Sequence, residues 1–133
     1  MGNASVVIVS HSRQLAAGLV ELAAQMAGPS VHLAAVGGIG DELGTSAPAI
    51  AEALRGCPVN SPILLFFDIG SAFMNCELAL ELVPENVRQR STLVDAPLVE
   101  GCIEAAVAAS LGQTDREVIT AAQKARTMLK VAR

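Results

Sequence analysis

Four short strand-like segments, most of them apolar and each followed by a predicted helix, constrain the fold of this chain more than any other feature. They are four to seven residues long and cover residues 4–10, 31–36, 62–67 and 91–94. A continuous apolar run of this length is typical of a strand buried on both faces of a parallel sheet. The sequence therefore predicts four strands, and residues 4–10 are expected to be buried on both faces.

The segments after these runs carry the signals of helices. Apolar residues recur at helical spacing from Leu15 through Leu19 and Leu22 to Met26, just before Gly28-Pro29. The other predicted helices cover 47–55, capped by Thr45 or Ser46, then 71–83, 97–111, and a last helix capped by Thr114 with a stripe of Val118, Ala122, Ala125 and Leu129. The order β-α-β-α-β-α-β-α-α predicts an α/β fold, a four-stranded parallel sheet with helices on both faces. At this length we expect a single domain spanning 1–133.

Composition excludes several classes of protein. The mean hydropathy is +0.49, yet no apolar run approaches the roughly 18–20 residues of a membrane span, and no basic flank precedes an apolar block as in a signal peptide. We therefore expect a cytoplasmic protein without a membrane partner. A net charge of −4, scattered basic residues and 2% aromatic residues argue against nucleic acid as a partner.

The cysteines Cys57, Cys76 and Cys102 give no evidence of a metal site. They form no CxxC pair, and the chain has only two histidines, so zinc-ligand spacing is absent. We expect buried, reduced thiols. No metal and no resident cofactor are predicted.

Chemistry-bearing residues gather in the loops that follow the predicted strands. These loops are Ser10-His11-Ser12, the glycine-rich segment 37–46, Asp68-Ile69-Gly70-Ser71, and Asp95-Ala96-Pro97. Ligands of open α/β sheets bind at the carboxyl ends of the strands. One edge of the sheet is therefore predicted to hold a histidine, an aspartate, several hydroxyls and several glycines.

His11 is the candidate nucleophile, and Asp68 is its candidate support. A neutral imidazole is nucleophilic near pH 7. A carboxylate that accepts a hydrogen bond from one ring nitrogen would leave the other nitrogen unprotonated. Anion contacts are expected from Ser12 at a helix N-terminus, from Gly38 and from Ser71. Two alternatives remain open, in which His11 is a capping residue without chemistry and Asp68 or Ser71 caps the helix 71–83.

The glycines at 37–40 are weak evidence, because ordinary loop structure also explains them. They match neither GxxxxGK[ST] nor GxGxxG, and no lysine precedes Lys124. This argues against a dedicated nucleotide-phosphate site. A phosphoryl group on His11 would then come from another protein rather than from ATP.

Three loop motifs taken together resemble a known family. They are Val7-Ile8-Val9-Ser10-His11-Ser12, then Asp68-Ile69-Gly70-Ser71-Ala72 with Met74-Asn75, then Ala96-Pro97-Leu98-Val99-Glu100-Gly101. In this order and spacing they resemble the phosphotransfer subunit of phosphoenolpyruvate-dependent dihydroxyacetone kinase, which has the mannose-type enzyme IIA fold. The resemblance covers about residues 4–130. It implies a three-layer α/β/α fold with strand order 2-1-3-4, and a homodimer.

The resemblance also implies a function, that of a phosphotransferase subunit. A phosphoryl group would pass from phosphoenolpyruvate through enzyme I and HPr to the histidine matching His11, supported by the aspartate matching Asp68. It would then pass to ADP held on the nucleotide-binding subunit of the kinase. Some such subunits continue into HPr-like and enzyme I-like domains; here the sequence ends at Arg133, so we expect those domains to be separate proteins.

Two other functions remain possible from the sequence. A sugar-transporter IIA component, or a regulatory phosphotransfer protein of the same fold, would carry the same histidine. The sugar-transporter group typically has a tryptophan and consecutive glycines in the third loop, where this chain has Asp68-Ile69-Gly70-Ser71-Ala72. The second possibility is a module that binds a small anion in its glycine loops without covalent chemistry.

Overall fold

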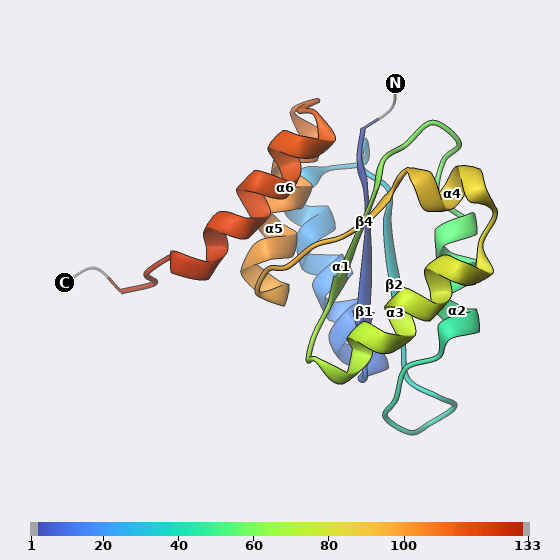
Figure 1. The fold of residues 1–133 in the computed structure, drawn as a ribbon. Helices are drawn as coiled ribbons and strands as arrows, with labels where there is room; N and C mark the ends of the chain where they lie inside the picture. The colour runs from blue at the N-terminus through green and yellow to red at the C-terminus, as the bar shows by residue number, and fades with distance from the viewer. Residues whose placement is uncertain (1–2, 132–133) are drawn as a thin grey trace.

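A four-stranded, all-parallel sheet forms the middle layer of the protein (Figure 1). The computed structural model describes residues 3–131. The strands are β1 (Ser5–Ser10), β2 (Leu33–Gly37), β3 (Ile63–Phe67) and β4 (Ser91–Leu93), in the order β2-β1-β3-β4. The predicted α/β fold and the strand order implied by the family resemblance are both confirmed.

Helices cover both faces of the sheet, which explains why the two central strands, β1 and β3, are mostly apolar. One face packs against α1 (Arg13–Ala27), α5 (Leu98–Ser110) and α6 (Asp115–Gln123), and the other against α2 (Ala47–Arg55), α3 (Ser71–Leu82) and α4 (Glu85–Gln89). Alternate residues of β1 contribute to the two cores: Val6 and Ile8 to the first, Val7 and Val9 to the second. The central strand is thereby held from both sides.

The helix caps explain where two of the helices begin. The side chain of Ser46 accepts a hydrogen bond from the Ala49 amide, and Thr114 forms a capping box with Glu117. Both caps were among those expected from the sequence. None of the helices between residues 3 and 131 is long and apolar enough to cross a membrane.

Several sequence-based expectations were wrong in detail. The helix α4 was missed, because its five residues are too few for an apolar period, although Val87 is buried. The last helix ends at Gln123 and continues as a 3₁₀ helix, Lys124–Thr127, so Leu129 lies outside the predicted stripe and is 84% exposed. The expected second strand at 31–36 runs instead from Leu33 to Gly37.

The buried face of α1 also differs from the prediction. Small residues allow this helix to approach the sheet closely, so the buried positions are Ala16, Leu19 and Ala23. Leu15, Leu22 and Met26, which shared the predicted apolar period with Leu19, are about half exposed. The apolar spacing indicated a helix correctly, but it did not identify the face that packs.

Gly37 allows the end of β2 to lie against the end of β1. A Cβ atom at this position would lie 2.2 Å from the carbonyl oxygen of Ser10, which is backbone and cannot turn aside. We therefore expect Gly37→Ala to lower the free energy of unfolding by about 1–3 kcal/mol, as overpacking does elsewhere. Urea unfolding followed by circular dichroism measures this.

Gly18 provides a matched control within α1. No atom lies within 4 Å of a Cβ built at this exposed helical position. Gly18→Ala should raise the free energy of unfolding by roughly 0.5–1 kcal/mol, because alanine loses less backbone entropy in a helix. Equal stability of Gly37→Ala and the wild type would contradict the close approach of β1 and β2.

Candidate functional site

The carboxyl ends of β1 and β3 bring a histidine and an aspartate together. These strands are neighbours, with Val9 opposite Phe67, and the Asp68 amide donates a hydrogen bond to the carbonyl of Val9 at 3.1 Å. Asp68 directly follows Phe67, and His11 lies two residues after Val9, just past the end of β1. Parallel pairing thus sets the relative position of residues 57 apart in the sequence.

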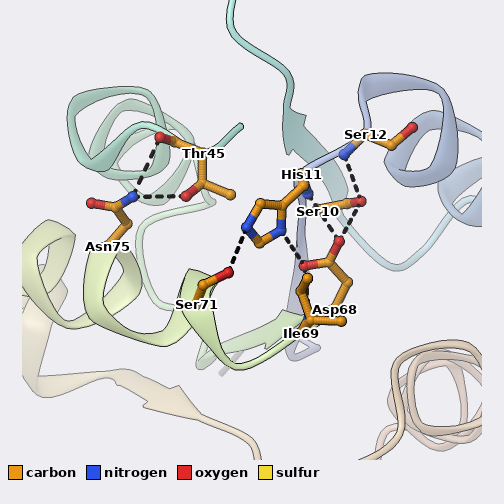
Figure 2. A network of polar contacts seen from close by, with 8 residues as sticks. All are labelled: Ser10, His11, Ser12, Thr45, Asp68, Ile69, Ser71 and Asn75. Carbon is orange, nitrogen blue, oxygen red and sulfur yellow. Dashed lines mark hydrogen bonds and ion pairs between the residues drawn. The ribbon is translucent and has the colours of Figure 1, made fainter. Parts of the chain in front are cut away.

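The Asp68 carboxylate accepts four hydrogen bonds, two on each oxygen (Figure 2). Oδ2 accepts from the Ser10 hydroxyl and the His11 amide, both at 2.9 Å. Oδ1 accepts from the Ile69 amide at 2.8 Å and lies 3.0 Å from Nδ1 of His11. This set of donors leaves the carboxylate little freedom to turn.

These hydrogen bonds keep Asp68 ionised. Burial acts in the opposite direction and would raise its pKa. The amides of His11 and Ile69, the His11 ring and the Ser10 hydroxyl outweigh that effect, so the pKa of Asp68 lies below its ordinary value. An ionised carboxylate can only accept hydrogen bonds.

The charge on Asp68 determines the tautomer of His11. Because the carboxylate only accepts, Nδ1 of the ring must carry the proton that lies between the two groups. In the neutral imidazole Nε2 is then unprotonated, and it accepts a hydrogen bond from the Ser71 hydroxyl at 2.8 Å (Figure 2). The side chain of His11 is 25% exposed, so its unprotonated Nε2 lies at the protein surface with the Ser71 hydroxyl as its only hydrogen-bond partner among the described residues.

The sequence-predicted contacts Ser71, Ser12 and Gly38 are placed differently around His11. Ser71 contacts the ring directly and does not cap α3, whose N-cap residue is Gly70. The hydroxyl of Ser12 caps α1, accepting from the Leu15 amide, while its own amide donates to Ser10. The amide of Gly38 donates to the Gly44 carbonyl within the second loop.

Asp68 likewise does not cap α3, because its carboxylate binds residues outside that helix. The fourth loop contributes nothing to this arrangement, since Asp95 pairs instead with Arg126 at 3.4 Å. Within residues 3–131, no group of three or more histidine, cysteine or acidic side chains is arranged to hold a metal ion.

Other nucleophiles are far less suited to the chemistry than His11. Burial, together with the negative charge of Asp68, raises the pKa of the Cys76 thiol to about 12, so it stays protonated. The second histidine, His32, lies beside the start of β2 in a surface hollow of about 600 Å³ at the opposite edge of the sheet. Of these three side chains, His11 is therefore the one whose geometry suits it to act as a nucleophile.

Comparison with known proteins identifies the family. Residues 5–119 match EIIA-man, described as the PTS system fructose IIA component. The chain belongs to this family. Its relatives include the phosphoryl donor subunit DhaM of phosphoenolpyruvate-dependent dihydroxyacetone kinase 2 from Listeria innocua, 44% identical over 116 residues, or 86% of this chain and 92% of the relative. The resemblance stated from the loop motifs is confirmed.

Two further comparisons add detail on length and fold. The corresponding subunit of Providencia stuartii is 40% identical over 124 residues, which is 90% of this chain, but this chain spans only 26% of that relative. A crystal structure of a protein of unknown function, EF1359, superimposes with a TM-score of 0.84 at 31% identity, covering 92% of this chain and 94% of that one. This chain therefore shares the fold of that protein over nearly its whole length.

Three residues near His11, namely Ser10, Thr45 and Asn75, were given no site role from the sequence. Ser10 is fully buried yet polar, and it bridges the Ser12 amide and Asp68. Asn75 donates hydrogen bonds to the Oγ1 atom of Thr45 at 2.7 Å and to its carbonyl oxygen at 3.3 Å. The role of Ser10 could have been suspected from the sequence, because a serine there ends an otherwise apolar strand. The pairing of Asn75 with Thr45 could not, because it depends on the packing of α3 beside α2.

The low pKa of Asp68 predicts a pH-dependent part of the stability. An unfolded aspartate titrates near pH 3.9, and the folded one titrates lower. The ionised form therefore stabilises the fold above about pH 4, and this contribution is lost as the pH falls through the lower folded pKa. We expect the wild type to be more stable than Asp68→Asn at pH 6, with a difference that shrinks toward pH 2. Urea unfolding at each pH measures it, and a pH-independent difference would contradict the assignment.

Proposed function

We propose that this protein is a phosphohistidine carrier of a dihydroxyacetone kinase. Nε2 of His11 accepts a phosphoryl group from HPr and passes it to ADP bound on the nucleotide-binding subunit of the kinase. The observation that carries the proposal is the hydrogen bond of Nδ1 to Asp68, which leaves Nε2 unprotonated at the surface. Relatives that are phosphoryl donor subunits of such kinases support it.

Each transfer exchanges one bond to phosphorus for another. The lone pair of Nε2 attacks the phosphorus, and the bond between phosphorus and the donor atom breaks, its electron pair leaving with the donor. The proton on Nδ1 stays in its hydrogen bond to Asp68, whose charge stabilises the positive charge that develops on the ring. The second transfer repeats these events with His11 as the donor and a phosphate oxygen of ADP as the nucleophile.

In this proposal Ser71 contacts the phosphoryl group directly, whereas Ser12 and Gly38 shape the loops around it. The Ser71 hydroxyl occupies the lone pair of Nε2, so it must turn away and can then donate to a phosphoryl oxygen. The amides of Ser12 and Gly38 already have partners, and these residues shape the two loops around the group. Phosphoryl transfer depends mainly on such positioning and on charge stabilisation.

The form of the surface supports transfer between proteins. Hollows of about 600 and 470 Å³ lie at the far edge of the sheet, and neither is lined by His11 or Asp68. A small-molecule enzyme usually places its reactive group in a concave pocket. A partly exposed histidine is instead accessible to the reactive group of a partner. The proposal includes a cytoplasmic homodimer, as the family resemblance implies.

A phosphorelay assay tests the function. The protein is incubated with labelled phosphoenolpyruvate, enzyme I and HPr, followed by the ADP-loaded kinase subunit and dihydroxyacetone with its binding subunit. We expect label on the protein that then moves into dihydroxyacetone phosphate. Label that remains on the protein would indicate a sugar-transport or regulatory partner, and no label would refute the carrier function.

A further inference from the structure

A closed series of contacts surrounds the space in front of Nε2. Nε2 contacts Ser71 at the start of α3, and Asn75 lies one turn further along the same helix. Asn75 binds Thr45, and the amide of Gly44, the residue before Thr45, donates to the His11 carbonyl at 2.8 Å. The first, second and third loops are thus tied together around one imidazole nitrogen (Figure 2).

The orientation of the Asn75 amide follows from its partners. The backbone carbonyl of Thr45 can only accept, so the group of Asn75 that faces it must be the NH₂ group. The same nitrogen lies 2.7 Å from Oγ1 of Thr45. Oγ1 of Thr45 therefore accepts this hydrogen bond, and the Asn75 side chain orients the Thr45 hydroxyl.

The hydroxyl proton of Thr45 is left without an acceptor among the described residues. Ser46, not Thr45, caps α2, so the Thr45 hydroxyl has no capping role. The first turns of α2 and α3 contain no acidic residue, so no carboxylate there competes for this proton or repels an anion. The hydroxyl of the partly buried Thr45 thus accepts a hydrogen bond from Asn75, and its proton remains available to donate to a ligand.

We propose that Thr45, oriented by Asn75, is a phosphoryl-binding residue of the His11 site. The Thr45 hydroxyl donates to a phosphoryl oxygen on Nε2, on the side opposite the Asp68 carboxylate. Asn75 is a positioning residue that acts through Thr45. This inference rests on the proposed phosphorylation of His11, and it adds a contact that neither the sequence motifs nor the fold assigns.

Thr45 and Ser71 have different parts in this arrangement. Ser71 contacts Nε2 before phosphorylation and must move when the phosphoryl group arrives. Thr45 keeps its contact with Asn75 throughout, so its hydroxyl needs no rearrangement at the moment of transfer. Donors that are already oriented stabilise a transition state better than donors that must turn.

The test compares Thr45→Val with Thr45→Ser. Valine keeps the shape and removes the hydroxyl, whereas serine keeps the hydroxyl. We expect Thr45→Val to accept phosphate from phosphorylated HPr about 10- to 100-fold more slowly, as for the loss of a hydrogen bond to a charged group. Thr45→Ser should remain within a few-fold of the wild type. The ³¹P resonance of the phosphohistidine should shift in Thr45→Val.

Asn75→Ala tests the positioning role, with Glu77→Ala as the control on the exposed side of α3. We expect Asn75→Ala to slow transfer, and the double variant with Thr45→Val to be no slower than Thr45→Val alone, because both act on one contact. Glu77→Ala should behave like the wild type. Thermal unfolding of each variant separates loss of fold from loss of the contact; should Thr45→Val be unfolded, Thr45→Ala and Asn75→Ala decide the question.

The outcomes distinguish the two proposals. Wild-type transfer rates and an unchanged ³¹P resonance in folded Thr45→Val would overturn the role of Thr45 while leaving the phosphohistidine intact. Absence of phosphate on the wild-type protein would instead refute the carrier function itself. Equal slowing by Thr45→Ser and Thr45→Val would also overturn the proposal, because it would show that the hydroxyl is not the group that matters.

Discussion

Replacing His11 by alanine is expected to abolish phosphorylation of the protein. Cys76 is kept protonated, and His32 lies at the opposite edge of the sheet, so neither can replace the lost nucleophile. With the nucleophile gone, uptake of label from phosphorylated HPr should fall below detection, a loss of at least about 10⁴-fold of the kind seen when a covalent nucleophile is removed. Labelled phosphoenolpyruvate with enzyme I and HPr measures it.

The matched control is His32→Ala. His32 takes part in the sheet only through its carbonyl, which accepts from the Val6 amide, so its ring can be removed without breaking that bond. We expect His32→Ala to be labelled like the wild type, and the label to be lost in acid, as phosphohistidine is. Acid-stable label, or label that persists in His11→Ala, would show that another residue carries the phosphoryl group.

The pairing of His11 with Asp68 could be predicted from the sequence because it depends on backbone topology. Each residue directly follows an apolar run, and parallel strands that are neighbours bring their carboxyl ends together. The short apolar runs indicated the strands, and the family resemblance supplied their order. Given both, the proximity of the two residues could be expected without any knowledge of side-chain packing.

Contacts between helices could not be predicted in the same way. The hydrogen bonds of Asn75 to Thr45 depend on the position of α3 beside α2, which is set by how buried residues such as Ile50 and Cys76 pack. The same limit explains why the exposed face of α1 was not foreseen. Apolar spacing identifies a helix, but which of its sides packs depends on the partner surface.

Ser71 shows how two plausible roles can be separated only by geometry. A serine at the first position of a helix suggests a cap, and this was expected alongside a phosphoryl contact. In the structure Gly70 is the N-cap residue without a side-chain bond, and the Ser71 hydroxyl turns to Nε2 of His11. The local sequence is compatible with both conformations, and the neighbouring imidazole determines which one forms.

Asp68→Asn is expected to slow phosphoryl transfer by roughly 10²- to 10⁴-fold, by analogy with other aspartates that orient a catalytic histidine. Both carboxylate oxygens accept a backbone amide, from His11 on one side and Ile69 on the other. An asparagine NH₂ group must therefore face a backbone N–H in either orientation. The variant loses the negative charge and at least one of these hydrogen bonds.

The two orientations of the side-chain amide in Asp68→Asn would impair transfer for different reasons. With its NH₂ group toward Nδ1, the amide would favour the tautomer with the proton on Nε2, which removes the nucleophilic lone pair. With its oxygen toward Nδ1, the tautomer survives, but no negative charge stabilises the ring as phosphorus binds to Nε2. Both act on the transfer step. Single-turnover labelling with phosphorylated HPr should therefore show a slower rate at saturating donor, with little change in the concentration that gives half-saturation.

Asp95→Asn is the control for this prediction. Asp95 is exposed, follows the neighbouring strand, and pairs with Arg126 rather than with His11. It should transfer at the wild-type rate, and circular dichroism should show that both variants are folded at pH 7. The ring nitrogens of His11 provide an independent readout, since ¹⁵N chemical shifts report which one is protonated. A wild-type rate in folded Asp68→Asn would mean that the surface position of Nε2, rather than its protonation state and the charge behind it, is sufficient for transfer.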